Sequence, residues 1–274
     1  AYAKDELKDY YGAIEDYSKA IELNPDYAYA YYNRGIAKDD LKDYYGAIED
    51  YSKAIELVPD DAVDAYNNRG FAKRNLKDYY GAISDFSKAI ELDPDYAYAY
   101  NNRGIAKGEL KDYYGAINDY SKAIELDPDY ADAYINRGND KGELKDYYGA
   151  IEDYSKAIEL DPDYTNAYNN RGIAKKNLKD YYGAIEDYSK AIELDPDYAY
   201  AYSNRGIAKG ELKDYYGAIS DHSKAIELDP DYANFYTGRG VAKYKLNDIG
   251  GACKDFRKAI SKGRRIRTIS SILG

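Results

Sequence analysis

Few side chains in this sequence are of the types that carry out catalysis. His222 is the only histidine and Cys253 is the only cysteine among the 274 residues. His222 takes the place that Tyr51 holds in an earlier copy of the same segment, which predicts a packed helix residue rather than a general base. Cys253 takes the place of Ile48, which predicts a small buried thiol rather than a nucleophile. Since no carboxylates are spaced as metal ligands, we expect no enzyme, no metal site and no cofactor.

Asparagine side chains offer a different chemistry, because an amide can both donate to and accept from a peptide backbone. Six asparagines recur at intervals of 34 or 35 residues, and Gly238 breaks the series. A ladder of such amides can hold an extended chain whatever its side chains are. The alternative interpretation is that the amides bridge neighbouring repeats. The series is Asn33, Asn68, Asn102, Asn136, Asn170 and Asn204.

Variation among the copies gathers near these asparagines. The positions of Tyr29, Tyr32, Asp39 and Asp40 differ from copy to copy. At about 100° per residue, these positions occupy roughly one third of a helix surface. We expect side chains on this stripe to select a bound partner. The candidates are Tyr29, Tyr98, Tyr200, Arg74 and Lys176.

Other positions stay constant although several of them should be exposed. Ser52, Lys53 and Glu56 recur unchanged through the six central copies. Drift at tolerant surface positions would have changed them as well. The contrast favours diversification of a binding surface, with drift after recent duplication as the alternative.

The prolines mark the period of the repeat. Seven prolines are separated by 34 residues, except for a gap of 35 between Pro59 and Pro94. The extra residue falls in the segment 59–63, where the usual Pro-Asp-Tyr-Ala is interrupted. Regular spacing of this length indicates a repeat array, in which each unit packs on its neighbours.

Each copy contains two segments with helical spacing. In the second copy they are residues 28–41 and 44–57. The second segment carries an apolar stripe that includes Ala47, Tyr51 and Ala54. Asp43 and Asp60 lie where helix N-caps are expected. Pro59 ends the second helix, because proline disfavours helix in the residue before it.

A helix-turn-helix of 34 residues with small residues at fixed places resembles the tetratricopeptide repeat family. The signature residues in one copy are Tyr31, Gly35, Ala47, Tyr51, Ala54 and Pro59. The resemblance covers residues 1–262. It predicts a partial repeat at 1–27 and further repeats at 28–62, 63–96, 97–130, 131–164, 165–198, 199–232 and 233–262.

The resemblance implies an all-α fold, a right-handed superhelix (α-solenoid) whose first helices line a concave groove. It also implies a scaffold for protein–protein interaction that binds an extended peptide in that groove. Some members of the family clamp a C-terminal carboxylate with basic residues. The position of Tyr32 holds no Lys or Arg in any copy, which disfavours this clamp.

One recurrent arginine departs from the family pattern. Arg34 and its counterparts stand where the family usually has a bulky apolar residue. A buried arginine needs a partner, and Asp50 recurs with it in every copy. We therefore expect Arg–Asp pairs. Gly46 and its counterparts occupy the third position of each second helix, which suggests close packing there.

The bulk composition limits the classes of partner. The net charge of −11 disfavours nucleic acid, which binds basic surfaces. No apolar run approaches the roughly 20 residues that span a bilayer, and the first residues show no signal-peptide pattern. A single cysteine permits no intramolecular disulfide. We expect a cytoplasmic protein that binds protein or peptide and binds neither nucleic acid nor membrane.

The last residues differ in charge from the rest. Residues 239–274 contain ten Lys or Arg against two Asp or Glu. The residues 263–274 are expected to be a basic tail or a helix that caps the last repeat. Head-to-tail self-association with the acidic N-terminal end of another chain is the second interpretation. The alternative function is accordingly a structural or self-assembling array, natural or engineered, with no dedicated ligand.

Overall fold

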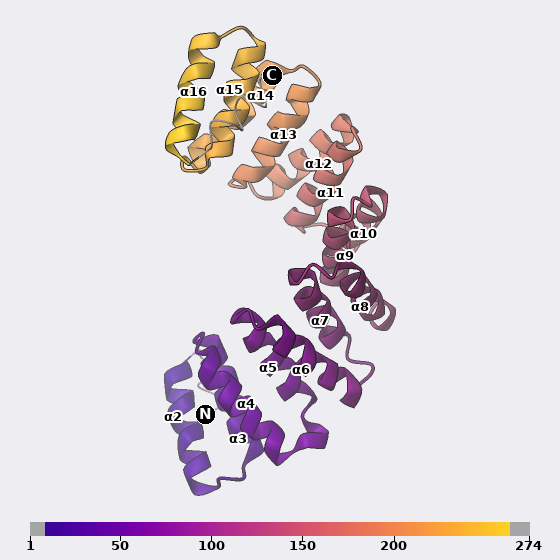
Figure 1. Cartoon of the computed structure of the whole chain (residues 1–274), viewed down its shortest axis with the longest axis vertical. Coiled ribbons are helices and arrows are strands. Elements are labelled where there is room, and N and C mark those ends of the chain that lie inside the picture. The colour runs from indigo at the N-terminus through magenta and orange to yellow at the C-terminus, as the bar shows by residue number, and fades with distance from the viewer. Residues whose placement is uncertain (1–8, 264–274) are drawn as a thin grey trace. The chain divides into compact units, whose positions relative to one another are not determined.

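The computed structural model describes residues 9–263 of the chain. Within that range it contains fifteen α-helices, one short 3-10 helix and no strands. The helices follow one another as antiparallel hairpins (Figure 1). We call the two members of each hairpin the first and the second helix. This confirms the all-α repeat fold.

The first helices each have thirteen residues, and the second helices have thirteen or fourteen. The first helices are α3 (Ala28–Asp40), α5 (Val63–Asn75), α7 (Ala97–Glu109), α9 (Ala131–Glu143), α11 (Thr165–Asn177), α13 (Ala199–Glu211) and α15 (Ala233–Lys245). The second helices are α2 (Tyr10–Leu23), α4 (Tyr44–Leu57), α6 (Tyr79–Leu92), α8 (Tyr113–Leu126), α10 (Tyr147–Leu160), α12 (Tyr181–Leu194), α14 (Tyr215–Leu228) and α16 (Ile249–Ser261).

The chain divides into two compact units, residues 1–140 and 141–274, with the boundary inside α9. Within the first unit, α4 packs on α3 of its own hairpin and on α5 of the next one. Within the second unit, α14 packs on α13 and α15 in the same way. The second helices α4 and α14 therefore each lie between two first helices, and no single central core is needed.

The second helices begin at an aspartate in every described repeat. The Oδ1 atom of Asp43 accepts a hydrogen bond from the N–H of Gly46 at 3.0 Å. A Cβ added to Gly46 would lie 2.3 Å from Oδ2 of the same aspartate. The predicted cap is confirmed, and Gly46 makes its close approach to the cap itself.

The predicted cap at Asp60 is wrong. The extra residue turns Pro59–Asp61 into the 3-10 helix η1, and α5 begins after Ala62 without a side-chain cap. The other first helices that have a described N-cap follow a tyrosine that also makes no capping bond, as Tyr27 does before α3. Packing against neighbours, rather than capping, therefore stabilises the start of the first helices.

The contact between the two helices of a hairpin depends on small residues. A Cβ on Gly35 would lie 2.7 Å from Cε1 of Tyr51, so only glycine lets the phenol ring pack flat on the first helix. Ala47 is fully buried beside it. The two helices of the hairpin therefore approach each other closely at Gly35 and Ala47.

A network of four charged and polar side chains recurs between the helices. Arg34 donates two hydrogen bonds to Asp50, from Nε at 2.8 Å and from Nη2 at 2.6 Å. Lys38 lies 2.7 Å from the same carboxylate. Nη1 of Arg34 donates to Ser18 of the preceding second helix at 3.0 Å. The Arg–Asp pairing is confirmed, and the serine extends it to the neighbouring repeat.

The constant serine in this network is not a free surface residue, contrary to the expectation from its sequence pattern. Ser52 accepts a hydrogen bond from Nη1 of Arg69 at 3.0 Å and donates to the carbonyl oxygen of Ile48 at 2.6 Å. Its constancy is therefore explained by packing between repeats. Lys53 and Glu56 do form an exposed pair, 2.8 Å apart. The contrast with the variable stripe rests on these two residues.

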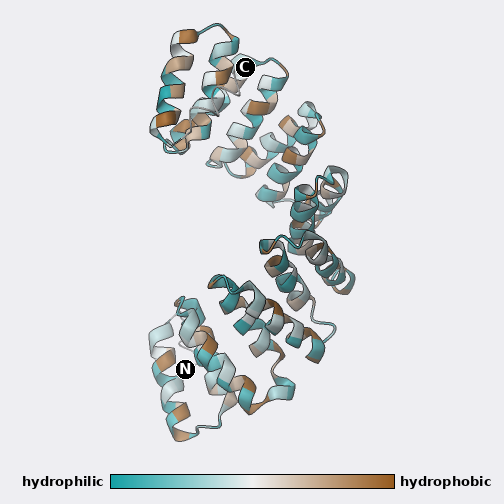
Figure 2. Cartoon of the chain, viewed as in Figure 1, coloured by the Kyte–Doolittle hydropathy of each residue, from teal (hydrophilic) through white to brown (hydrophobic). Residues whose placement is uncertain are grey.

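The helices carry both hydrophobic and hydrophilic residues along their length. Figure 2 shows hydrophobic and hydrophilic residues interleaved along the helices of both units. No helix among residues 9–263 is both long and apolar enough to cross a membrane.

Candidate binding face on the first helices

The exposed surface formed by the first helices carries three of the predicted selectivity residues. Tyr29, Tyr98 and Tyr200 are 52%, 55% and 47% exposed. Each also contacts a neighbouring tyrosine. The ring centroids of Tyr98 and Tyr130 lie 5.1 Å apart, for example. Contact with a neighbouring ring already restricts these side chains. A ligand that binds to their exposed faces would therefore cost little further side-chain entropy.

The Tyr32 position does not belong to this surface, contrary to the prediction. Asn67, Asn101, Asn169, Ser203 and Thr237 occupy this position in other copies and are buried. The first helix packs on its own second helix and also faces the next repeat. The buried part of its circumference is therefore wider than a single amphipathic stripe would give.

The asparagine series forms hydrogen bonds between neighbouring repeats. Nδ2 of Asn102 donates to Oδ1 of Asn67 at 3.1 Å, and Nδ2 of Asn136 donates to Oδ1 of Asn101 at 3.0 Å. Asn204 donates likewise to Asn169 at 3.0 Å. The bridging that was considered as an alternative is therefore present.

Two members of the series use other acceptors. Asn68 donates to the hydroxyl of Tyr32 at 3.1 Å, and Asn33 donates to the carbonyl oxygen of Tyr29 at 2.8 Å. In contrast, Oδ1 of Asn102, Asn136 and Asn204 accepts no hydrogen bond from any residue between 9 and 263. These oxygens remain open to a ligand.

The predicted selectivity residues Arg74 and Lys176 are only partly exposed. They extend from the ends of α5 and α11 into the space beside the next first helix. The guanidinium of Arg74 lies over the ring of Phe71, 4.7 Å from its centroid. Burial lowers the pKa of both Arg74 and Lys176, against the opposing effects of Glu109 and Glu211 respectively. They fill space between repeats as well as adding positive charge.

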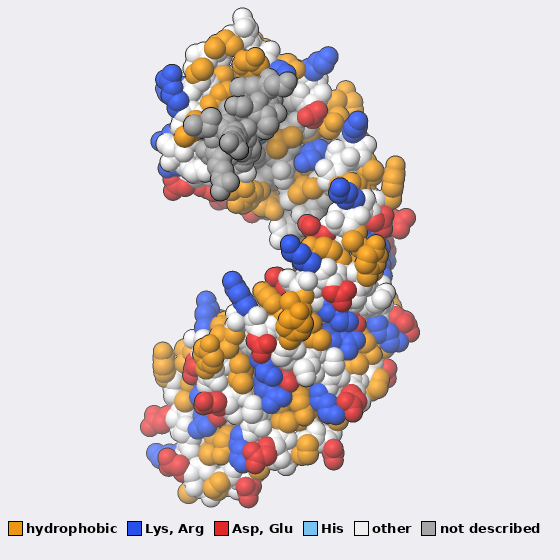
Figure 3. Space-filling model, viewed as in Figure 1, with side chains coloured by type: hydrophobic (Ala, Val, Ile, Leu, Met, Phe, Trp, Pro, Cys, Tyr) orange, Lys and Arg blue, Asp and Glu red, His pale blue; other side chains and the backbone are white. Residues whose placement is uncertain are grey.

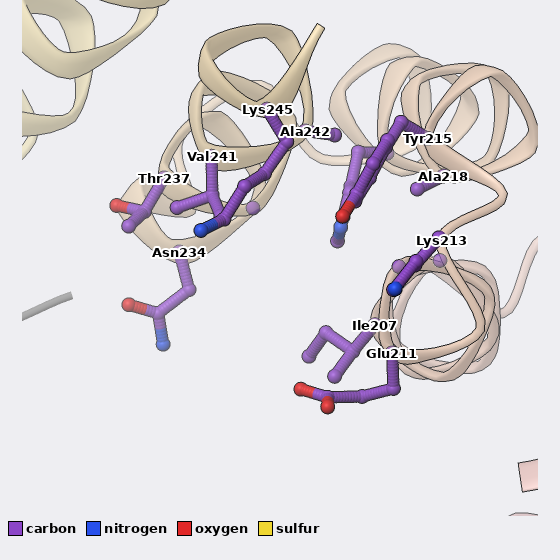
Figure 4. A pocket seen from close by; sticks show the side chains of 14 residues that line it. Ile207, Glu211, Lys213, Tyr215, Ala218, Asn234, Thr237, Val241, Ala242 and Lys245 are labelled. Atoms are coloured by element: carbon purple, nitrogen blue, oxygen red, sulfur yellow. The ribbon is translucent and has the colours of Figure 1, made fainter. Parts of the chain in front are cut away.

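A pocket of about 590 Å³ opens in the second unit between α13 and α15. Figure 4 shows Ile207 and Glu211 of α13 facing Val241 and Asn234 of α15 across it, with Tyr215 of α14 pointing into the space. No single motif in the sequence marks this pocket. The sequence does indicate it indirectly, because several residues that depart from the repeat, such as His222 and Gly238, lie close together between α13 and α15.

His222 contributes to the floor of this pocket and is 2% exposed. Its Nδ1 lies 3.4 Å from the hydroxyl of Ser203. Burial is the main cause that lowers the pKa of His222 to about 4. The positive charge of Arg239 lowers it further, and Asp221 opposes the shift. The ring is therefore neutral at pH 7, as a packed residue should be, and the prediction that His222 is packed is confirmed.

Cys253 is exposed, so the prediction of a buried thiol is wrong. The position of Ile48 is covered by the first helix of the following repeat, whereas no described helix follows α16. The expected capping role of residues 263–274 concerns a segment that lies, from residue 264, outside the described range. Among the described residues, no three His, Cys, Asp or Glu are grouped to hold a metal ion.

Charges of both signs are mixed on the surface. Figure 3 shows Lys or Arg and Asp or Glu side chains interspersed over the visible face of each unit. Repeated exposed pairs such as Lys122 and Glu125, which lie 2.8 Å apart, contribute to the mixed charge of the surface. Local pairing of this kind adds little stability.

Comparison with known proteins agrees with the geometry. The tetratricopeptide repeat pattern matches residues 28–61, 63–96, 97–130, 131–164, 165–198 and 199–232, and a TPR repeat pattern matches residues 6–38. The chain belongs to the tetratricopeptide repeat family. The sequence matches no curated protein.

Solved structures with the same fold include two that share at least a quarter of their aligned residues with this chain. YrrB, a TPR protein with an unusual peptide-binding site, is 25% identical, with 66% of this chain and 93% of that chain covered and a TM-score of 0.57. MamA is 28% identical over 58% of this chain and 93% of that chain, with a TM-score of 0.55. A tetratricopeptide repeat protein from Parabacteroides merdae ATCC 43184 is 22% identical over 94% and 98%, with a TM-score of 0.68.

Proposed function

We propose that this protein is a non-catalytic interaction scaffold that binds an extended segment of a partner protein along its first helices. The observation that carries the proposal is the exposure of Tyr29, Tyr98 and Tyr200 on these helices. Rigid aromatic side chains of this kind are favoured anchors at protein interfaces. The likeness to YrrB supports a peptide as ligand.

The asparagine series contributes to this proposal through fewer atoms than the sequence predicts. The amide N–H groups bond to the neighbouring repeat, so they are less available to a ligand. The Oδ1 atoms of Asn102, Asn136 and Asn204 can accept hydrogen bonds from N–H groups of the partner's backbone. Arg74 and Lys176 add positive charge to the surface, which favours acidic residues in the bound segment.

The tyrosines are tested by a triple substitution with a matched control. A peptide array is probed with the full chain, and the affinity of a bound peptide is then measured by fluorescence anisotropy. Replacing Tyr29, Tyr98 and Tyr200 with Ser should weaken binding by about tenfold or more. The control replaces Tyr45, Tyr114 and Tyr216 of the second helices, which are 72%, 72% and 77% exposed. An equal loss of affinity in the two triple variants would contradict the proposal.

The ladder is tested on the ligand, so the fold of the protein is not disturbed. N-methylation removes one backbone N–H at a time from the bound peptide. Loss of about 1 kcal/mol or more at several positions is expected if side-chain oxygens accept those groups. Uniform tolerance of N-methylation would show that the backbone is not held by the asparagines.

Self-association is a second candidate, favoured by the surface of α16. Ile249 and Ile260 are 47% and 39% exposed, and the cationic Lys254 and Arg257 are exposed on the same helix. Another copy of this chain, whose residues before 239 are strongly acidic, would offer the opposite charge. Light scattering should then show an increase in mass with concentration that 0.5 M salt reverses. A constant monomer mass would remove this candidate.

A further inference from the structure

The pocket between α13 and α15 borders on the position that most other repeats fill with a tyrosine. In the second copy, the ring of Tyr51 packs so closely on Gly35 that an added Cβ would lie 2.7 Å from it. In the seventh copy the ring is replaced by the shorter His222. A Cβ on Gly206 would meet Nε2 of His222 only at 3.1 Å. The outer end of the phenol has no counterpart there.

A second departure moves the imidazole away from this space. The asparagine of the series is replaced by Gly238 in α15. A Cβ there would lie 2.4 Å from Cε1 of His222, so the imidazole leans into the room that the missing side chain leaves. The floor of the pocket is therefore a flat ring held between two glycines.

A glycine, which also stands at this position in α7 and α9, keeps the side of the pocket open. Arg74 and Lys176 fill the space between repeats from the ends of their helices, and both are largely desolvated. Gly210 takes that position in α13. Among the described residues, the atom near an added Cβ would be Cβ of Ala218 at 4.0 Å. No side chain of the chain itself therefore enters the space from this position.

A third departure changes the charge at the rim. The hydroxyls of Tyr79 and Tyr181 donate to Glu109 and Glu211 of the following first helix, at 3.3 and 3.5 Å. The corresponding acceptor for Tyr215 is replaced by Lys245. Lys213 also lines the pocket. Neither lysine has a carboxylate partner among the described residues.

We propose that this pocket binds an aromatic side chain from the partner's bound segment, with an acidic residue beside it in that segment. The hollow adjoins the place where other copies hold the outer end of a tyrosine ring. Ile207 and Val241 form apolar walls (Figure 4). The volume of about 590 Å³ accommodates an indole or a phenol ring with room for the adjoining backbone.

The chemistry favours an aromatic ring over an aliphatic chain. The imidazole of His222 is 2% exposed and forms part of the pocket floor, and its Nε2 has no hydrogen-bond partner among residues 9–263. The ammonium groups of Lys213 and Lys245 attract the electron-rich face of a ring and pair with a neighbouring carboxylate. This inference rests on the proposed function, since it assigns one anchor of the bound segment.

Small probes test the pocket without knowledge of the natural partner. The chain contains no tryptophan, so excitation of a tryptophan peptide reports on the peptide alone. The peptides Ac-Glu-Trp-Glu-NH2 and Ac-Glu-Leu-Glu-NH2 are compared with the full-length protein, by fluorescence anisotropy for the first and by NMR line broadening for both. The tryptophan peptide should bind about tenfold more tightly or better. Equal binding would overturn the aromatic assignment.

Two substitutions place the probe in the pocket. His222→Tyr restores the ring of the other copies and should weaken binding of the tryptophan peptide about tenfold. Gly210→Arg imitates Arg74 and should do the same by a different route. Circular dichroism and urea titration confirm that each variant is folded. Unchanged binding by both folded variants would overturn the proposal.

The charge at the rim has a matched control. Lys213→Gln should weaken binding of the acidic peptide severalfold, whereas Lys179→Gln, at the same position one repeat earlier, should not. Equal effects of the two changes would overturn the role of Lys213. The outcomes are separable from the proposed function. If the tyrosines Tyr29, Tyr98 and Tyr200 govern binding of the larger partner but the pocket binds no probe, only this inference fails.

Discussion

The backbone after each first helix has a conformation that L-amino acids seldom adopt. Six lysines, together with Asn247, have φ values between 62° and 65° at this point. In Lys111 the N–H donates to the carbonyl oxygen of Gly108 at 2.8 Å, which closes the helix. The left-handed conformation costs a residue with a Cβ roughly 1–2 kcal/mol. These residues therefore hold a sharp turn at some expense of stability.

The substitution Lys111→Gly should raise the free energy of unfolding by about 0.5–1 kcal/mol, because glycine adopts this conformation without strain. Urea denaturation followed by circular dichroism measures the change. Lys122→Gly, inside α8, is the control and should lower stability by about 1 kcal/mol. If both changes lower stability, the turn is not strained.

The buried His222 makes stability depend on pH. Its pKa is about 4 in the folded protein, whereas an unfolded histidine has a pKa near 6.5. Below pH 6.5 the unfolded chain therefore binds the proton and the folded chain does not. The free energy of unfolding should fall as the pH falls from about 6.5 to about 4, by about 2 kcal/mol at pH 5.

Comparison with His222→Tyr isolates this effect, since the carboxylates titrate in both proteins. The difference in unfolding free energy between the two proteins is measured at pH 7.5 and at pH 5. The variant should gain about 2 kcal/mol relative to the parent over this range. A difference that does not change with pH would show that the imidazole is protonated or solvated in the folded state.

Single residues were predicted well where the copies agree and poorly where only their spacing was known. The pairing of Arg34 with Asp50 and the burial of His222 follow from recurrence alone. The Tyr32 position and Cys253 were misplaced, because their exposure depends on which neighbouring repeat covers them. The pocket could not be read from any one position, since it results from His222 and Gly238 acting together.

At the scale of the element, the sequence determined helix bounds closely. The structure has α3 at Ala28–Asp40 and α4 at Tyr44–Leu57, against expected segments of 28–41 and 44–57. The error lay in the cap of α5, where the extra residue forms η1. A local insertion changes backbone geometry in a way that the repeat pattern cannot specify.

The polar network should contribute more to hairpin stability than the exposed ion pairs. Arg103 donates two hydrogen bonds to Asp119, at 2.9 and 2.7 Å, and a third to Ser87 at 3.0 Å. Arg103→Ala leaves the buried carboxylate with Lys107 as its remaining cationic partner. The unfolding free energy should fall by about 2–3 kcal/mol.

The exposed pair Lys122–Glu125 provides the comparison, since its atoms lie 2.8 Å apart in solvent. Lys122→Ala should change stability by less than about 0.5 kcal/mol. Both changes are followed by urea denaturation at pH 7. Equal losses would mean that the network is no stronger than a surface pair.

At the scale of the molecule, the main contacts among residues 9–263 join helices of one repeat or of successive repeats within each unit, as α7 contacts α8 of its own repeat and α6 of the preceding one. Stability in such an array is a sum of repeat terms and nearest-neighbour terms. A defect in one repeat should therefore open that repeat and its neighbours before the rest. Arg103 also donates a hydrogen bond to Ser87 of α6, so the effect of Arg103→Ala should extend to the preceding repeat.

Hydrogen–deuterium exchange with mass spectrometry can follow this spread in the Arg103→Ala variant. Protection should fall most in α7 and α8, by about 30-fold to 150-fold if the local loss is about 2–3 kcal/mol. It should fall less in α6, which loses one hydrogen bond to the serine, and should stay unchanged in α15 and α16. Peptides from α15 provide the internal control in the same sample. A uniform loss of protection along the chain would instead indicate that all repeats unfold as one cooperative unit, because a local defect would then lower the stability of every helix equally.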